Sequence, residues 1–290
     1  MHNQLALRNY AKGLAVTLSD IVYRKSRAVR TIIADLMGAR GALLCKFNED
    51  HVIVFFPGDF IGEEILARGT YDRHSAKLVA EAVGPRFRSG SARTIVEVGA
   101  NIGTHTIYLD RELRPERFLC IEPDSENARV LRANLLLNGL SGKARVLELG
   151  ASDRNGTQRF MRMIRNRGGS YFSEEEKLFT SDIEQQVAVD RLDDILASEG
   201  IEPETIGLVW MDVEGHELKA LAGMTNILAA RVPIYFEFDA PSHTTESIRS
   251  LAHLLRSGER EVYVCDGEKL DSIGVEAISE LRYTCNLLVL

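Results

Sequence analysis

The chain has 290 residues, of which 45% are hydrophobic and 27% charged, and its formal net charge is −7. These values are ordinary for a globular protein and allow a sizeable core. No apolar run approaches the roughly 18 residues that span a bilayer, and the start lacks the apolar stretch of a signal peptide, so we expect a cytoplasmic protein.

The charge is distributed unevenly. Residues 1–40 carry a net charge of +5, which leaves −12 on the remainder. A duplex nucleic acid partner favours a basic face, so the acidic body argues against one. Cys45, Cys120, Cys265 and Cys285 lie far apart and form no CxxC pair. We therefore expect reduced, mostly buried thiols rather than a zinc site or disulfides.

The first 70 residues are predicted to form an appendage to a main domain at 71–290. Residues 4–37 have helical spacing and end before Gly38, a plausible stop. This basic, amphipathic segment either packs on the core or on a second copy, giving a homodimer, or lies weakly on a membrane surface. Two short strands are expected within 42–56, around a turn at 48–50, followed by a helix over 72–84.

From residue 94 onward, short runs of Val, Ile and Leu alternate with helical segments. Buried strands are predicted at 94–98, 117–121, 144–149, 207–211 and 233–237, with helices at 104–113, 125–138, 215–228 and 244–257. Further strands are expected at 261–266 and 285–290, the last one antiparallel. This alternation predicts an α/β, Rossmann-like fold with a seven-stranded, mostly parallel sheet.

Residues 154–186 interrupt the alternation between the third and fourth strands. The segment is polar, with several arginines, then Ser170 and Tyr171, then an acidic run at 174–176. A long insertion on a compact sheet is typical of a substrate loop, and Ser170 and Tyr171 are the candidate acceptor contacts. A solvated loop without that role is the alternative.

The first strand ends in a turn, EVGANIG at 97–103. In an open α/β sheet, ligands bind beyond the carboxyl ends of the strands, where the strand order switches. Gly99 and Gly103 are expected to let a ligand approach the main chain closely. Glu122 ends the second strand, where an acidic side chain accepts hydrogen bonds from both ribose hydroxyls of an adenosine cofactor.

The type of cofactor follows from charge and spacing. A dinucleotide site uses GxGxxG, whereas this turn has GxxxG with Glu97 before it. A carboxylate there repels phosphates and favours a cationic sulfonium with an amino group. The YxxxK pair of short-chain dehydrogenases is also absent from the sequence. The pattern therefore favours S-adenosylmethionine over a nicotinamide cofactor.

The third strand ends at residues 149–153. Ala151 could pack on the adenine, and Ser152 or Asp153 could reach its amino group. The alternative is a turn stabilised by the Ser and Asp side chains.

Acidic side chains follow the fourth and fifth strands. Asp212 and Glu214 come after the fourth strand, and Glu237 ends the fifth. These carboxylates are expected to converge at the mouth of the sheet, where they need hydroxyl donors, a shared proton or a cation. They could hold the aminopropyl group of the cofactor and the polar groups of an acceptor, or a divalent metal. His216 is either a catalytic group or a surface residue.

Several motifs together resemble the FkbM-type methyltransferases: EVGANIG (97–103), IEPDSENARVLRANLLLNG (121–139), VDRLDDIL (189–196), WMDVEGHELKALAG (210–223) and IYFEF (234–238). The resemblance runs from about residue 60 to residue 238 and does not cover the first 40 residues or the insertion well. It implies a class I methyltransferase fold and in-line transfer of a methyl group from S-adenosylmethionine to an acceptor hydroxyl on a small molecule or glycan. The lead-in at 58–72 resembles that of the family, where Tyr71 would approach the cofactor.

The expected site residues follow from the pattern and the resemblance together. Asp212 and Glu214 are expected to position the acceptor hydroxyl, His216 to serve as base or orienting group, and Glu237 to contact the acceptor, with no metal ligand assigned. The residues expected to contact the cofactor are Tyr71, Glu97, Gly99, Ala100, Asn101, Gly103, Thr104, Glu122, Pro123, Ala151, Ser152, Asp153 and Asp212.

Two rival functions are weighed against this one. Enzymes that methylate amino groups of nucleic acids carry an Asn/Asp-Pro-Pro-aromatic motif after the fourth strand, and this chain has Asp-Val-Glu-Gly there. A protein acceptor is a further alternative. A non-catalytic, cofactor-binding scaffold would have no reason to keep Asp212, Glu214 and His216.

Overall fold

A computed structural model describes residues 41–290, except 91, 165, 174–181 and 257–259. The helix predicted at 4–37, with its expected roles in dimerisation or membrane association, lies outside the described residues. Within the described part, no helix is long and apolar enough to cross a membrane.

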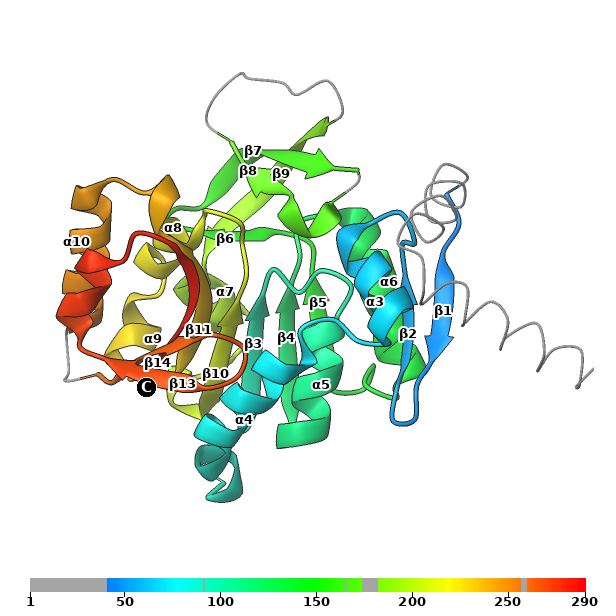
Figure 1. The fold of residues 1–290 in the computed structure, drawn as a ribbon, viewed down its shortest axis with the longest axis horizontal. Coiled ribbons are helices and arrows are strands. Elements are labelled where there is room, and N and C mark those ends of the chain that lie inside the picture. The colour runs from blue at the N-terminus through cyan, green and yellow to red at the C-terminus, as the bar shows by residue number, and fades with distance from the viewer. Residues whose placement is uncertain (1–40, 91, 165, 174–181, 257–259) are drawn as a thin grey trace, which may run out of the picture.

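The main sheet has eight strands in the order β13-β12-β14-β11-β10-β3-β4-β5 (Figure 1). The five central strands pair in parallel: β5 (Ala144–Leu147), β4 (Arg117–Ile121), β3 (Thr94–Val98), β10 (Ile206–Met211) and β11 (Ile234–Asp239). β14 (Thr284–Val289) lies antiparallel between β11 and β12 (Val262–Cys265). This confirms the class I methyltransferase sheet predicted from the sequence, including its antiparallel last strand.

The eighth strand, β13 (Leu270–Ile273), was not predicted. It pairs with β12 at the sheet edge, in a link that also holds the 3-10 helix η4 (Val275–Glu280). Only one face of an edge strand packs on the protein, so its sequence, LDSI, lacks the continuous apolar run of a central strand.

Two hydrophobic cores cover the two faces of the main sheet. On one face pack α3 (Phe60–Arg68), α4 (Arg73–Arg88), α5 (Thr104–Leu113) and α6 (Ser125–Leu137). On the other pack α7 (Leu192–Ser198), α8 (Glu217–Ala222), α9 (Thr225–Ala229) and α10 (Thr245–Arg256). The single helix predicted at 215–228 is therefore two short helices. Each central strand alternates its side chains between these two cores, which explains its unbroken apolar sequence.

The hairpin of β1 (Leu44–Phe47) and β2 (Val52–Phe55) confirms the two strands expected within 42–56. Asn134 and Asn138 of α6 hydrogen-bond to the main chain of β2, and Ile53 and Phe55 join the core beneath α3 and α4. The domain boundary at residue 70 stays a prediction, and the segment preceding it shares a core with the main sheet.

The insertion between β5 and β10 is not a long loop, as the sequence suggested, but largely a second sheet. Its strands are β6 (Gly150–Ser152), β9 (Asp182–Arg191), β7 (Gly156–Met163) and β8 (Tyr171–Phe172), with the 3-10 helix η1 (Arg167–Gly169) before β8. We call this the inserted sheet. It lies above the carboxyl ends of the central strands, at the top of Figure 1. Arg165 and residues 174–181 of the insertion lie outside the described residues.

Candidate active site

A pocket lies between the carboxyl edge of the main sheet and the inserted sheet, at the switch in strand order between β3 and β10. We call it the edge pocket. Its main-sheet wall includes Gly99, Asn101, Glu122, Pro123, Asn127 and Asp212. Its other wall includes Gly150, Ala151, Phe160, Arg167, Gly168, Ser170 and Phe172 of the inserted sheet. The pocket thus has a polar wall and a wall that is partly aromatic.

The glycine turn after β3 is shaped mainly by contacts within the protein. Gly99, Asn101 and Gly103 all have positive φ, of 81°, 50° and 84°. A Cβ on Gly99 would lie 1.9 Å from the carbonyl oxygen of Asp212, and one on Gly103 would lie 2.5 Å from Leu131 Cδ1. Both positions therefore favour glycine whether or not a ligand is bound. The expected close approach of a ligand stays a prediction at both, and Gly99 lines the edge pocket.

Glu122 is held in a fixed orientation at the end of β4. Its Oε2 accepts a hydrogen bond from the Asn101 N–H at 2.7 Å, and its Oε1 accepts one from the Asp124 N–H at 2.8 Å. Burial raises the pKa of Glu122 to about 8, although these two hydrogen bonds oppose the rise. Each oxygen keeps acceptor capacity for a ligand hydroxyl.

Other predicted cofactor residues lie near the pocket without lining it. Ala100 and Thr104 are buried on either side of Gly103. Glu97 is 1% exposed and accepts a hydrogen bond from the Thr106 hydroxyl beneath α5, and burial raises its pKa to about 7. The charge argument had placed Glu97 beside the ligand. One carboxylate oxygen of Glu97 is taken by Thr106 of α5, and the other is buried without a hydrogen-bond partner in the described structure, so a contact of Glu97 with the cofactor stays a prediction.

The end of the predicted third strand belongs to the inserted sheet. Ala151 of β6 lines the edge pocket. Ser152 is buried and its hydroxyl lies 3.0 Å from His216 Nε2, while also donating to Asp153 at 3.1 Å. Ser152 and Asp153 therefore make a local hydrogen-bonded turn and do not line the pocket.

His216 lies behind the aromatic wall. It is 5% exposed, and its ring packs against Phe172 with the centroids 4.7 Å apart. Because Ser152 and Phe172 cover the imidazole, this arrangement does not support His216 as the general base and instead makes it a support for Phe172. Glu217, the first residue of α8, is also buried and accepts a hydrogen bond from the Gly215 N–H at 2.9 Å.

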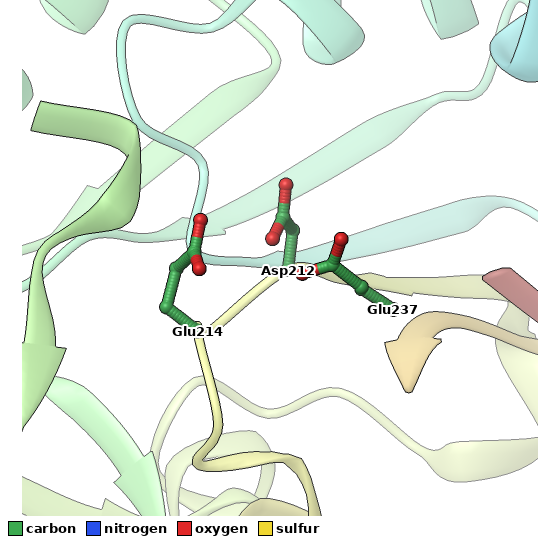
Figure 2. Close-up of side chains that lie close together, drawn as sticks. All are labelled: Asp212, Glu214 and Glu237. Atoms are coloured by element: carbon green, nitrogen blue, oxygen red, sulfur yellow. The ribbon is translucent and has the colours of Figure 1, made fainter. Parts of the chain in front are cut away.

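The carboxylates of Asp212, Glu214 and Glu237 converge, as the sequence predicted. We call these residues the acidic trio. One oxygen of each lies within 4.8 Å of the others, and Figure 2 shows the three side chains directed toward a common space. Glu214 and Gly215 both have positive φ, of 47° and 84°, and this sharp turn returns the Glu214 side chain toward Asp212.

Burial and mutual repulsion make the trio hold protons more tightly than free carboxylates. Burial, then the charges of Asp212 and Glu237, raise the pKa of Glu214 to about 8. Burial, then Asp212, raise the pKa of Glu237 to about 7. Burial also raises the pKa of Asp212, although the neighbouring His105 opposes this. Hydroxyl donors, an amine or a divalent cation would each relieve this repulsion.

Replacing Glu214 with glutamine tests this charge repulsion through pH-dependent stability. The unfolded carboxyl titrates near 4.5 and the folded one near 8, so its contribution to stability is complete below 4.5 and is lost as pH rises through 8. The amide stays neutral, so Glu214→Gln should raise the melting temperature by about 2–4 °C at high pH. Thermal unfolding should show this gain disappearing in acidic buffer. The exposed Glu204→Gln is the control, and an equal gain at all pH values would contradict the account.

The remaining predicted residues are Ser170, Tyr171 and Tyr71, and they lie in different places. Ser170 lines the edge pocket, whereas its neighbour Tyr171 does not, because successive residues of an extended strand face opposite sides. Tyr71 lies beside the acidic trio instead of in the pocket. Burial, then the charges of Asp212 and Asp72, raise the pKa of its hydroxyl.

Sequence reasoning missed the residues whose contacts hold the inserted sheet against the rest of the protein beside the edge pocket. Arg167 stacks its guanidinium on Phe56 at 4.0 Å, approaches Glu126 at 3.0 Å, and donates its main-chain N–H to Asp59 at 2.7 Å. Asp59 is buried, and burial raises its pKa to about 6. Phe160 and Phe172 were also missed. Their apolar character within a polar segment was the available signal.

A family model described as the methyltransferase FkbM domain matches residues 97–261, more than half of the chain. The chain belongs to the FkbM methyltransferase family. This match begins at Glu97, includes the glycine turn and the acidic trio, and spans most of the inserted sheet.

Two curated relatives of this FkbM-family chain are similar over about half of it. Methyltransferase sdnD of Sordaria araneosa is 30% identical over a match of 156 residues, and the match covers 45% of this chain and 60% of the relative. The 2-O-methyltransferase NoeI of Sinorhizobium fredii is 30% identical over a match of 162 residues, and the match covers 50% of this chain and 62% of the relative. The matched region thus spans about three fifths of each relative.

Solved structures also align with the FkbM-family chain. Cofactor-bound Rv0187 from MTB aligns with a TM-score of 0.45 and 14% identity, covering 96% of this chain and 95% of the other. The O-methyltransferase TomG from Streptomyces achromogenes, solved with SAM, aligns with a TM-score of 0.45 and 15% identity, covering 91% and 98%.

Proposed function

We propose that this chain is an S-adenosylmethionine-dependent methyltransferase that methylates a hydroxyl group on a small molecule or glycan. The main support is Glu122, whose carboxylate is buried at the end of β4 and aligned by two main-chain N–H groups on the wall of the edge pocket. A carboxylate so placed is suited to a ribose diol. Membership of the FkbM family supports the same conclusion.

The edge pocket fits an adenosine cofactor in its other groups too. The side-chain oxygens Asn101 Oδ1 and Asn127 Oδ1 are buried without a hydrogen-bond partner in the described structure, and both residues line the pocket. Buried polar atoms of this kind call for a ligand or water donor. Phe160 and Phe172, with ring centroids 5.2 Å apart, offer an apolar surface for a purine.

The acidic trio supports acceptor chemistry next to this pocket, because Asp212 belongs to both. Bound in the pocket, S-adenosylmethionine would supply a methyl group on a positively charged sulfur, which passes to the acceptor oxygen and leaves a neutral thioether. Asp212 would accept the hydroxyl proton as the new O–C bond forms, and Glu214 and Glu237 would orient the acceptor. Such a base is worth about 10²–10⁴-fold in rate.

The test is transfer of an isotope-labelled methyl group from S-adenosylmethionine to a panel of saccharides and polyketide alcohols, followed by mass spectrometry. We expect a labelled O-methyl product that survives EDTA with less than about a twofold loss, because the proposed transfer of the hydroxyl proton to Asp212 needs no metal. Label on nitrogen alone would contradict O-methylation. If EDTA abolished formation of the labelled product and Mg²⁺ restored it, the acidic trio would be assigned as a metal site.

A further inference from the structure

A row of aromatic rings leads from solvent to the acidic trio. Phe60, the first residue of α3, is 54% exposed, and its ring meets the edge of Tyr71 at 6.1 Å. The Tyr71 ring lies 6.2 Å from His105, which packs on Trp210 at 4.5 Å. Trp210 lies in β10, and Asp212 follows two residues later, just beyond the end of the strand. Residues two apart along extended backbone face the same side of the sheet. The outer end of this row is the exposed Phe60 with the half-buried Tyr71 beside it, and the inner end carries the trio.

The segment that carries Phe60 also lies near the edge pocket. Ile61, the residue after Phe60, is close enough to the η1 turn that a Cβ on Gly168 would lie 3.2 Å from Ile61 Cδ1. Gly168 lines the pocket. The start of α3, which carries Phe60, therefore lies beside the η1 wall of the edge pocket, and Tyr71 lies beside the acidic trio.

The chemistry of the neighbouring groups selects the kind of molecule. Carboxyl oxygens accept hydrogen bonds from hydroxyls, so the trio suits a ligand with several hydroxyl groups. Three crowded carboxyl groups already disfavour ionisation, so they also disfavour an anionic acceptor. The rings of the exposed Phe60 and the half-buried Tyr71 offer apolar area to a ligand with a C–H face. A saccharide ring combines hydroxyl donors at its edge with such a face, whereas a long apolar chain would leave the carboxylates without donors.

We propose that Phe60 and Tyr71 form a stacking platform for a neutral or cationic saccharide, whose hydroxyls are received by Asp212, Glu214 and Glu237. The platform rests on the proposed function, since it supplies the acceptor for the same site. Figure 2 shows the three carboxylates that would receive these hydroxyls pointing toward one another. Phe60 and Tyr71 select the acceptor and take no part in moving the proton.

Saturation-transfer difference NMR tests the platform on the full chain loaded with S-adenosylhomocysteine. The probes are methyl glucoside, methyl galactoside, methyl rhamnoside and methyl glucosaminide, with methyl glucuronide as the anionic match to the glucoside. We expect saturation of ring protons in at least one neutral or cationic glycoside and none in the glucuronide. Absence of saturation in every glycoside, or stronger saturation in the glucuronide, would overturn the proposal.

Variants separate stacking from general damage. Phe60→Ala and Tyr71→Ala should weaken glycoside binding about tenfold, whereas Tyr71→Phe keeps the ring and should stay within about threefold. Phe47→Ala is the matched control, because Phe47 is 78% exposed on β1. Equal effects at Phe60 and Phe47 would refute the platform. Calorimetric affinity for S-adenosylhomocysteine should be unchanged in Phe60→Ala and Phe47→Ala. A wild-type chain that does not bind S-adenosylhomocysteine would instead refute the proposed function.

Discussion

Replacing Glu122 with alanine is expected to weaken the binding of S-adenosylhomocysteine at least about 100-fold. The two ribose hydroxyls favour the ionised form of Glu122 when they bind, and hydrogen bonds to a charged acceptor are each worth about 1.5–3 kcal/mol. No neighbouring side chain can take over this role. The main-chain N–H groups of Asn101 and Asp124 hold the Glu122 carboxylate in its position. Isothermal titration calorimetry measures the loss directly.

Folding must be separated from binding in this experiment, because the alanine variant leaves those two N–H groups without their acceptor. Glu122→Gln keeps an acceptor oxygen and should give an intermediate loss, of about tenfold. Glu148→Ala, at an exposed position just beyond β5, is the control and should bind as the wild type does. Wild-type affinity in a folded Glu122→Ala variant would remove Glu122 from the cofactor site.

Asp212→Asn is expected to lower turnover at least about 100-fold while leaving affinity for S-adenosylhomocysteine within about threefold. The amide keeps the shape of the side chain and cannot accept the hydroxyl proton, so the loss should fall on the chemical step. The labelled-methyl assay measures turnover, and calorimetry measures affinity. The close-lying Asp239→Asn should keep near wild-type turnover. An active Asp212→Asn enzyme would show that proton acceptance occurs elsewhere.

The central strands were predictable because both faces of each are buried. TIVEV, RFLCI and IGLVWM are almost wholly apolar, as a strand between two helical layers requires. The order of strands and helices then restricts the topology to a parallel sheet with few alternatives. The convergence of the acidic trio was also predictable, since the carboxyl ends of adjacent parallel strands meet at one edge.

The inserted sheet was not predictable in the same way. β7 reads GTQRFMRM and β9 reads DIEQQVAVDR, so polar residues outnumber apolar ones and resemble a solvated loop. Strands with a largely exposed face do not need apolar residues on that face. Their pairing joins residues from 19 positions apart (Met163 with Asp182) to 33 positions apart (Gly156 with Val189), and no local pattern reveals that register.

Side-chain direction at the remaining site positions could not be predicted from the sequence. Glu97 accepts a hydrogen bond from Thr106 of α5, and His216 lies against Ser152. Both orientations depend on which face of a strand or turn meets the inserted sheet. Tyr71 lies beside the acidic trio, next to Asp72 at the N-cap of α4, and its expected contact with the cofactor stays a prediction.

A crystal structure of the chain with S-adenosylhomocysteine tests the central claim most directly. The account predicts the ligand in the edge pocket, with both ribose hydroxyls on Glu122, the purine near Phe160 and Phe172, and the sulfur directed toward Asp212. A ligand bound elsewhere, or an edge pocket that stays empty at saturating ligand, would contradict it.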